Sequence, residues 1–197
     1  LKAISKYGVG VNNIDLEYAS QRGIVVANTP GANSLAVAEL AIGLMFAVSR
    51  RICVSDRNIR EGKWQQYPGL QIKGKVMGLV GTGQIGRHTG ELARGLGMEV
   101  ICYDLHPDEE WAESIGARYV PLPEIITDAG FISIHVPLTD DTFHLISSTE
   151  LDQMKPSAVV INTARGGIID EEALYEALKD GKIAGAGLDV FETEPLT

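Results

Sequence analysis

The sequence predicts a doubly wound α/β domain, in which helices cover both faces of a parallel sheet. From Lys75 onward, short strand-like runs alternate with helical segments, as they do in successive βαβ units. The strand-like runs are continuous and rich in Val and Ile, so both of their faces should be buried. A parallel sheet with helices on either side satisfies both observations.

Five strands and five helices are expected in this region. The strands are expected at residues 76–80, 100–103, 131–134, 159–161 and 186–188, and the helices at 86–96, 108–115, 123–127, 149–154 and 171–179. The last helix has clear boundaries, because acidic residues 170–172 suit the positive end of the helix dipole and Gly181 can end the helix.

The first third of the chain has shorter elements and one long helix. A strand-like run at 3–4 leads to a glycine-rich turn at 7–13, and a helix at 16–22 precedes a buried strand at 24–26. Ser34 is placed to cap a helix that runs towards Ile59 with apolar residues around most of its surface. This pattern suits a bridging or dimerisation helix and a simple core helix equally well.

The composition is that of a globular protein and excludes several function classes. The net charge is −9, whereas nucleic-acid binding needs clustered Lys and Arg, so no nucleic acid partner is expected. The most apolar stretch, 35–48, is interrupted by Glu39 and too short to span a membrane. Cys53 and Cys102 lack metal-ligand spacing and lie in apolar stretches, which predicts reduced core thiols in a cytoplasmic protein without a metal.

A glycine motif, Gly81-Thr82-Gly83-Gln84-Ile85-Gly86, follows the strand that ends at Val80 and opens a helix. The motif alone is a weak signal, but the strand–turn–helix context is that of a dinucleotide-binding, Rossmann-type domain. Gly81 permits the tight turn, Gly83 lets a pyrophosphate approach the backbone, and Gly86 lets helix and strand pack closely. Free N–H groups at the helix start are then expected to bind the pyrophosphate.

Asp104 ends the next expected strand. A carboxylate at this place accepts hydrogen bonds from the adenosine ribose hydroxyls and repels the 2′-phosphate of NADP. No Arg or Lys follows immediately, and a protonated His106 is the one group that could offset the charge. We therefore expect NAD as the cofactor.

Arg165 follows a buried strand within Asn162-Thr163-Ala164-Arg165-Gly166-Gly167. Open parallel sheets bind ligands at the carboxyl ends of their strands, and the arginine fork suits a planar carboxylate or α-keto acid. A structural ion pair explains an isolated arginine equally well.

Further motifs accompany these residues through essentially the whole chain. They are Tyr7-Gly8-Val9-Gly10, Asn13-Ile14-Asp15, Asn28-Thr29-Pro30-Gly31, Val37-Ala38-Glu39-Leu40, His135-Val136-Pro137-Leu138-Thr139, Asp170-Glu171, Asp189-Val190-Phe191 and Glu194-Pro195. In this order the motifs resemble those of the D-isomer-specific 2-hydroxyacid dehydrogenases, and most closely the branch that acts on 3-phosphoglycerate.

The resemblance implies an NAD-dependent oxidoreductase that transfers a hydride between the nicotinamide and C2 of a D-2-hydroxy acid, 3-phosphoglycerate or a related small acid. Arg165 would bind the substrate carboxylate and polarise the C2 oxygen, while Glu194 would pair with a catalytic histidine and raise its pKa. Backbone N–H groups of Val9 and Gly10 would bind the substrate carboxylate, and Lys6 a substrate phosphate. Besides the glycines and Asp104, the implied cofactor contacts are Gln84, Ile85, His135, Val136, Pro137, Thr142, Thr163, Ala164 and Asp189.

The resemblance also divides the chain. Residues 1–33 are expected to be the C-terminal remnant of a flavodoxin-like substrate domain. Residues 34–197 are expected to form the NAD-binding Rossmann domain, with the long helix serving as the dimerisation element of a homodimer.

Two departures from the family pattern stand out. Asn12 occupies a position where the family has Asp. The family's catalytic histidine follows the Glu-Pro motif, and none of the four histidines here (88, 106, 135 and 144) matches that position. Because the chain also opens on Leu1 and stops at Thr197, we expect a fragment that binds NAD but lacks full catalysis.

Other functions fit the same motifs. A glyoxylate or hydroxypyruvate reductase would differ mainly in substrate contacts. A formate or phosphite dehydrogenase is less favoured, since formate enzymes carry an amide where Glu194 stands. An NAD(H)-sensing binding protein, like the C-terminal-binding-protein corepressors, would keep the fold without turnover. Intact Arg165, Asp189 and Glu194 argue against a non-catalytic relative.

Overall fold

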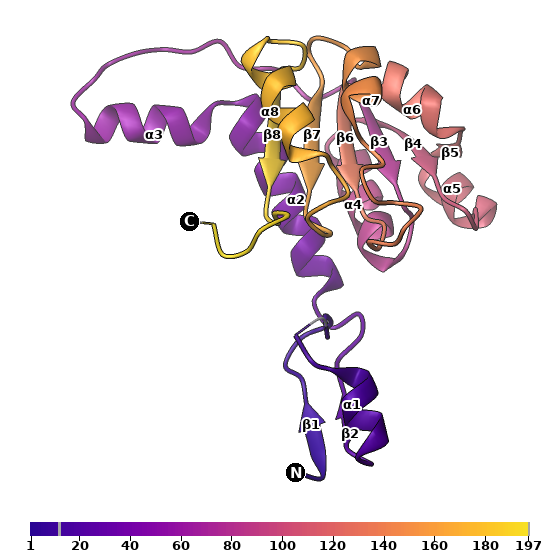
Figure 1. The fold of residues 1–197 in the computed structure, drawn as a ribbon. Coiled ribbons are helices and arrows are strands. Elements are labelled where there is room, and N and C mark those ends of the chain that lie inside the picture. The colour runs from indigo at the N-terminus through magenta and orange to yellow at the C-terminus, as the bar shows by residue number, and fades with distance from the viewer. Residues whose placement is uncertain (12, 197) are drawn as a thin grey trace.

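A computed structural model describes residues 1–11 and 13–196, and it confirms the predicted doubly wound α/β fold. Six parallel strands lie in the order β5-β4-β3-β6-β7-β8 (Figure 1). The strands are β3 (Val76–Val80), β4 (Glu99–Tyr103), β5 (Arg118–Tyr119), β6 (Phe131–Ile134), β7 (Val159–Asn162) and β8 (Gly185–Leu188). The strand order reverses between β3 and β6, as in a Rossmann fold, which opens a crevice at the carboxyl ends of these strands.

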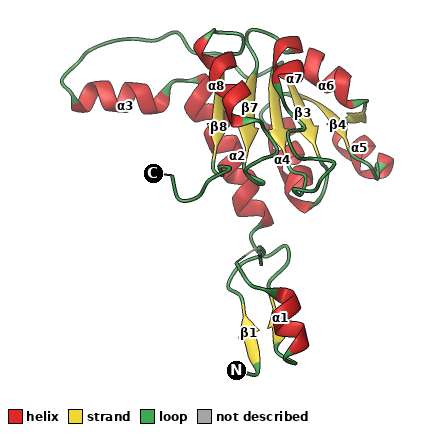
Figure 2. Cartoon of the chain, in the orientation of Figure 1, coloured by secondary structure: helices red, strands yellow, loops and turns green. Residues whose placement is uncertain are grey.

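Helices cover both faces of the sheet (Figure 2). One face packs against α6 (Leu122–Asp128), α7 (Ser148–Gln153) and α8 (Glu171–Lys179), and the other against α2 (Ser34–Ser49), α4 (Gln84–Gly95) and α5 (Glu109–Ile115). Successive strand residues therefore enter opposite cores, as Leu79 and Val80 do. This explains why the strand-like runs contain no polar alternation: β7 is buried along its whole length.

The first residues form a small unit ahead of α2 (Figure 1). Its strands β1 (Ala3–Ser5) and β2 (Val25–Ala27) pair in parallel, and α1 (Leu16–Gln21) connects them. Asp15 caps α1, because its Oδ1 accepts the N–H of Tyr18 at 2.8 Å, and Gly23 follows the helix with a φ of +65°.

The long helix expected from Ser34 to Ile59 is in fact two helices, α2 and α3 (Ile52–Arg60). The carbonyl of Ser49, which would continue the helical ladder, instead accepts the N–H of Leu70 at 2.8 Å, and Arg51 turns the chain with a φ of +52°. The cap prediction is also wrong: Asn33 is the N-cap residue. The hydroxyl of Ser34 instead donates to Oε1 of Gln84 at 3.1 Å, which joins α2 to the start of α4.

Both cysteines are free, but only Cys102 is a core thiol. Burial, helped by the charge of Asp104, raises the pKa of Cys102 to about 12, so this thiol stays protonated. Cys53 is exposed on α3, a helix without buried residues, so the prediction of a second core thiol is wrong. Within the described part of the chain, no helix combines the length and apolarity that crossing a bilayer requires.

Candidate functional site

In the glycine loop between β3 and α4, two of the three glycines are tightly packed against backbone and the third borders open space. A Cβ on Gly81, whose φ is +97°, would lie 2.8 Å from the carbonyl carbon and oxygen of His135. A Cβ on Gly86 would lie 2.1 Å from the carbonyl oxygen of Gly81, so only glycine lets α4 approach the loop this closely. A Cβ on Gly83 would meet nothing within 4 Å. Gly83 thus leaves space beside the first N–H groups of α4, where an anionic pyrophosphate can bind.

Asp104, at the end of β4, is hydrogen-bonded to this loop. Its Oδ2 accepts the N–H of Thr82 at 2.6 Å and the hydroxyl of Thr82 at 2.9 Å, and its Oδ1 accepts the N–H of His106 at 2.9 Å. Partial burial raises the pKa of Asp104, but these hydrogen bonds outweigh burial and hold the pKa below its usual value. The carboxylate is therefore charged at neutral pH.

Tyr119 of β5 completes this network, and the sequence pattern did not indicate it. The hydroxyl of Thr82 donates its one proton to Asp104, so it must accept from the hydroxyl of Tyr119, which lies 2.7 Å away. The strand β5 is only two residues long and was not predicted either.

A groove of about 620 Å³ lies at the carboxyl ends of the central strands. Predicted site residues that line it are Val9, Gly10, Ile85, His135, Val136, Pro137, Thr163, Ala164, Arg165 and Asp189. Residues that were not predicted also line it: Gly31, Asn33, Ser34, Val37, Leu138 and Val190. Most of the residues that were not predicted lie at or just before the start of α2. This helix is distant in sequence from the strands of the groove, so its place beside them could not be predicted.

The groove contains a polar atom that needs a partner. The hydroxyl oxygen of Thr163 is buried and bonds to no other described residue. His135 lines the same groove, its Nε2 is 2.9 Å from the Oγ of Ser133, and burial lowers its pKa to about 4, so its ring is neutral at neutral pH. A flat ring bearing a carboxamide can fill such a site and satisfy the hydroxyl, and the neutral His135 ring repels neither redox state of a nicotinamide. Together with the open glycine loop, the groove therefore fits a nicotinamide dinucleotide.

A second pocket, of about 590 Å³, contains Arg165 and Glu194. It shares Gly10, Leu138, Arg165 and Val190 with the groove, so the two cavities adjoin, and together they are called the cleft. Arg165 makes no ion pair with another described residue, which removes the structural explanation of this arginine. Among the described residues its guanidinium donates only to the carbonyl of Ala164, at 2.6 Å, and remains able to bind a carboxylate.

Asn162 positions the turn that carries Arg165. Its Nδ2 donates to the carbonyl of Arg165 at 2.8 Å, and its Oδ1 accepts the N–H of Ala164 at 3.0 Å. On the other side of the pocket, Oε1 of Glu194 accepts the N–H of Phe191 at 3.0 Å. Both chemically important side chains thus stand on turns that have their own internal hydrogen bonds.

The glycine loop, Asp104 and Arg165 all lie in a stretch that a protein-family model matches. The family model described as "D-isomer specific 2-hydroxyacid dehydrogenase, NAD binding domain" matches residues 42–197. The chain belongs to this family. The resemblance drawn from the motifs and the expected cofactor, NAD, are confirmed.

Relatives of this dehydrogenase domain carry different substrate names. A glyoxylate reductase of Thermococcus litoralis is 48% identical over 99% of this chain and 62% of that protein. A D-3-phosphoglycerate dehydrogenase of Archaeoglobus fulgidus is 45% identical over 99% of this chain and 37% of that protein. The apo structure of D-lactate dehydrogenase from Escherichia coli has a TM-score of 0.92 at 37% identity and covers 99% of this chain and 62% of that chain. The chain therefore spans less than two thirds of the length of each.

Seven predicted site residues line neither cavity: Lys6, Gly81, Gly83, Gln84, Gly86, Asp104 and Thr142. Five of them belong to the glycine loop or, as Asp104 does, bond to it, and the other two lie beside the cavities. The Nζ of Lys6 donates to Oδ1 of Asn13 at 3.2 Å, and Asn13 lines the pocket of Arg165. The hydroxyl of Thr142 donates to the carbonyl of Pro137 at 2.6 Å and so shapes the turn that forms one wall of the groove. Asn12, the departure from the family pattern, lies outside the described residues.

Replacing Asp104 with alanine is expected to lower the affinity of this NAD-binding domain for NADH about tenfold or more, because hydrogen bonds to a charged group contribute about 1.5–3 kcal/mol. The native protein should bind NADH more tightly than NADPH, and the substitution should narrow that difference. Calorimetric titration with each dinucleotide measures both effects. Asp152→Ala, which removes an exposed carboxylate paired with Lys182, is the control. Tighter binding of NADPH by the native protein would refute the role of Asp104.

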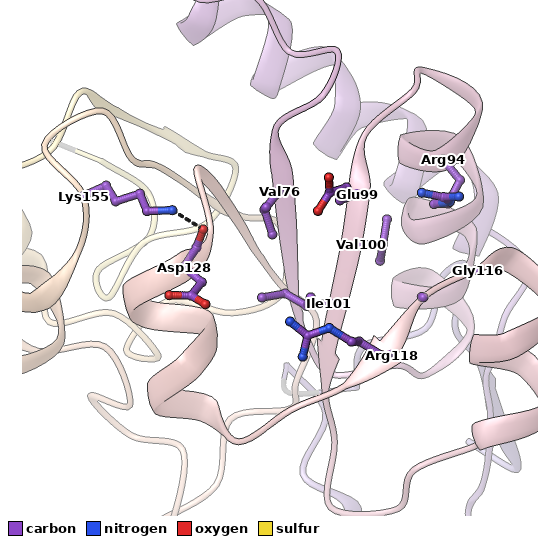
Figure 3. A pocket seen from close by; sticks show the side chains of 10 residues that line it. Val76, Arg94, Glu99, Val100, Ile101, Gly116, Arg118, Asp128 and Lys155 are labelled. Atoms are coloured by element: carbon purple, nitrogen blue, oxygen red, sulfur yellow. Dashed lines mark hydrogen bonds between the residues drawn. The ribbon is translucent and has the colours of Figure 1, made fainter.

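A further pocket, of about 630 Å³, lies at the opposite, amino ends of the strands (Figure 3). Its cationic side chains already have protein partners. Arg94 donates to the carbonyls of Ile115 and Met98 at 2.8 and 2.9 Å. Arg118 pairs with Glu124 at 2.7 Å. Figure 3 shows the hydrogen bond that Lys155 donates to the carbonyl of Asp128. With these partners, the three cationic side chains are less available to an anionic ligand than Arg165 of the cleft is.

Proposed function

We propose that this chain is the cofactor-binding part of an enzyme that transfers a hydride between C4 of the nicotinamide and C2 of a D-2-hydroxy acid. The observation that supports it is the junction of the cofactor groove and the Arg165 pocket, because Arg165 belongs to both. A substrate carboxylate bound to Arg165 would therefore place C2 beside the nicotinamide end of the groove. The bound cofactor supplies or accepts the hydride.

The residues of the cleft have separable roles in this proposal. The guanidinium of Arg165 binds the substrate carboxylate and polarises the C2 oxygen, and the backbone N–H groups of Val9 and Gly10 face the same carboxylate. Asp189 and Thr163 line the groove and would hold the nicotinamide carboxamide there, where it would give the buried Thr163 hydroxyl a partner. Glu194 holds a histidine that exchanges the hydroxyl proton and favours its charged form.

None of the four histidines in the described part of the chain supplies that proton-exchanging group. Only His135 lines the cleft, and with a pKa of about 4 it is a poor proton donor at neutral pH. We therefore propose that the 197 residues by themselves bind NAD without robust turnover. Residues 1–33 would belong to the substrate domain and residues 34–197 to the NAD-binding domain.

Within the hydroxy acids we propose 3-phosphoglycerate as the substrate, with glyoxylate or hydroxypyruvate as the alternative. Lys6 supports the phosphorylated acid, because its ammonium lies beside Asn13 at the edge of the Arg165 pocket. The named relatives include both kinds of enzyme, at 45% and 48% identity.

Turnover of a panel of 2-keto acids by the complete polypeptide with NADH tests this proposal. We expect the highest kcat/KM for 3-phosphohydroxypyruvate, and Lys6→Ala should lower it about tenfold while leaving glyoxylate unaffected, since about 1.4 kcal/mol is lost with one charged contact. Lys2→Ala, an exposed lysine outside both cavities, is the control. Preference for glyoxylate, with no effect of Lys6→Ala, would favour the glyoxylate or hydroxypyruvate reductase. Turnover of none of the acids would refute the proposed enzymatic activity.

We also propose a homodimer. The helix α3 projects from the domain, as Figure 1 shows, and carries the exposed apolar side chains Ile52, Val54 and Ile59. Trp64, 85% exposed, follows it. Exposed apolar side chains on a projecting helix support an interface between subunits, where contact with a second copy would bury them.

A further inference from the structure

His144 stands outside the cleft and contacts the turns that carry both catalytic side chains. Its backbone has a φ of +51°, a conformation that residues other than glycine rarely adopt. In this conformation its N–H donates to the carbonyl of Gly167 at 2.8 Å, in the turn that follows Arg165. The unfavourable backbone conformation of His144 therefore directs its N–H to a hydrogen bond with the turn that follows Arg165.

The imidazole ring of His144 reaches the other catalytic turn. Its Nε2 lies 3.1 Å from Oε1 of Glu192, two residues before Glu194. Its Nδ1 lies 3.7 Å from Oδ2 of Asp170, which caps α8. The ring also stacks on Phe143, with ring centroids 3.9 Å apart.

Glu192 is fixed to the start of α8 as well. Its Oε1 accepts the N–H of Glu171 at 3.2 Å, and its own N–H donates to Oε1 of Glu171 at 2.6 Å. The turn also packs tightly on the Arg165 segment, because a Cβ on Gly166 would lie 2.0 Å from the carbonyl oxygen of Phe191. A small displacement of Glu192 would therefore move Glu194 relative to Arg165.

We propose that His144 is a positioning residue that holds the Glu194 turn in register with the Arg165 turn. His144 lines neither cavity, so it acts through Glu192 and Gly167 and does not touch the substrate. The assignment rests on the proposed function, since it requires Arg165 and Glu194 to act in one reaction. A misplacement of about 1 Å between such groups can cost about 100-fold in rate.

The test compares His144→Asn with a matched control in the complete polypeptide. Asparagine tolerates a positive φ but is too short to keep the contact with Glu192. We expect kcat for the keto acid to fall about tenfold or more while the Kd for NADH changes less than about twofold. His88→Ala, which removes another histidine–carboxylate pair, with Glu91 on α4, should leave kcat unchanged.

A double-mutant cycle with Glu192→Gln tests the route of the effect. If His144 acts through Glu192, the two substitutions are non-additive in kcat, and Glu192→Gln alone gives the answer should His144→Asn not fold. Equal loss of NADH binding, additive effects, or an unchanged kcat in both variants would overturn the proposal. Arg165→Ala measured in parallel separates the two inferences: if it keeps full turnover, the proposed function fails, and if it alone loses turnover, only the role of His144 fails.

Discussion

Gly86→Ala is expected to destabilise the NAD-binding domain by about 3 kcal/mol or more and to abolish measurable NADH binding. The new Cβ would lie 2.1 Å from the carbonyl oxygen of Gly81. Because Cβ and the carbonyl oxygen are both fixed to the backbone, the clash can be relieved only by moving α4 away from the sheet. Urea denaturation gives the free energy of unfolding, and calorimetric titration gives the affinity for NADH.

Gly83→Ala provides the contrasting case in the same loop. Its Cβ would meet nothing within 4 Å, and its φ of −64° suits alanine, so stability should change by no more than about 0.5 kcal/mol. The methyl group would nevertheless occupy the space of the pyrophosphate, and the affinity for NADH should fall about tenfold or more. Equal stabilities for the two variants would contradict the packing role of Gly86, and unchanged NADH binding in Gly83→Ala would contradict the pyrophosphate-binding role of Gly83.

Arg165→Ala is expected to lower kcat/KM for the keto acid about 1000-fold with little change in NADH affinity. The substitution removes the charged donors that hold the carboxylate and stabilise charge on the C2 oxygen, and the loss of one such donor costs about 100- to 1000-fold. Steady-state kinetics of the complete polypeptide, with NADH titration alongside, measures both quantities.

Arg165→Lys separates charge from geometry, because lysine keeps the charge but not the planar fork. We expect kcat/KM to fall about 100-fold, to a value between that of the native protein and that of the alanine variant. Arg118→Ala, in the pocket at the opposite end of the sheet, is the control and should leave kcat/KM unchanged. A loss of NADH binding in Arg165→Ala equal to the loss of kcat/KM would show that Arg165 serves the cofactor instead.

The sheet could be predicted from the sequence because each central strand is covered on both faces. Burial on both faces leaves a continuous run of apolar residues, which is visible in the sequence. Val76–Val80 and Phe131–Ile134 form strands at the predicted bounds for this reason. The glycine loop was also predictable, since its conformational demands are local. The break at Arg51 was not, because it depends on Leu70 taking the carbonyl of Ser49 from a loop far along the chain.

The candidate site shows the same limit. The motifs indicated Arg165, Glu194 and the glycines, but the residues that hold them do not carry their own pattern. Asn162 was only the first residue of a motif with no role of its own, but its side chain bonds to backbone groups of both Ala164 and Arg165. His144 was compared only with the position of a catalytic histidine. Its contacts with Glu192 and Gly167 join segments that meet only in the folded chain.

The hydrogen bonds between Asp104 and Thr82 have a consequence for changing the coenzyme. The carboxylate that we expect to repel a 2′-phosphate also holds the second residue of the glycine loop, through both its N–H and its hydroxyl. Exchanging Asp104 for a basic residue would thus remove a repulsive charge and release the loop in the same step. A variant designed for NADPH needs a new acceptor for Thr82, as well as a cation for the phosphate.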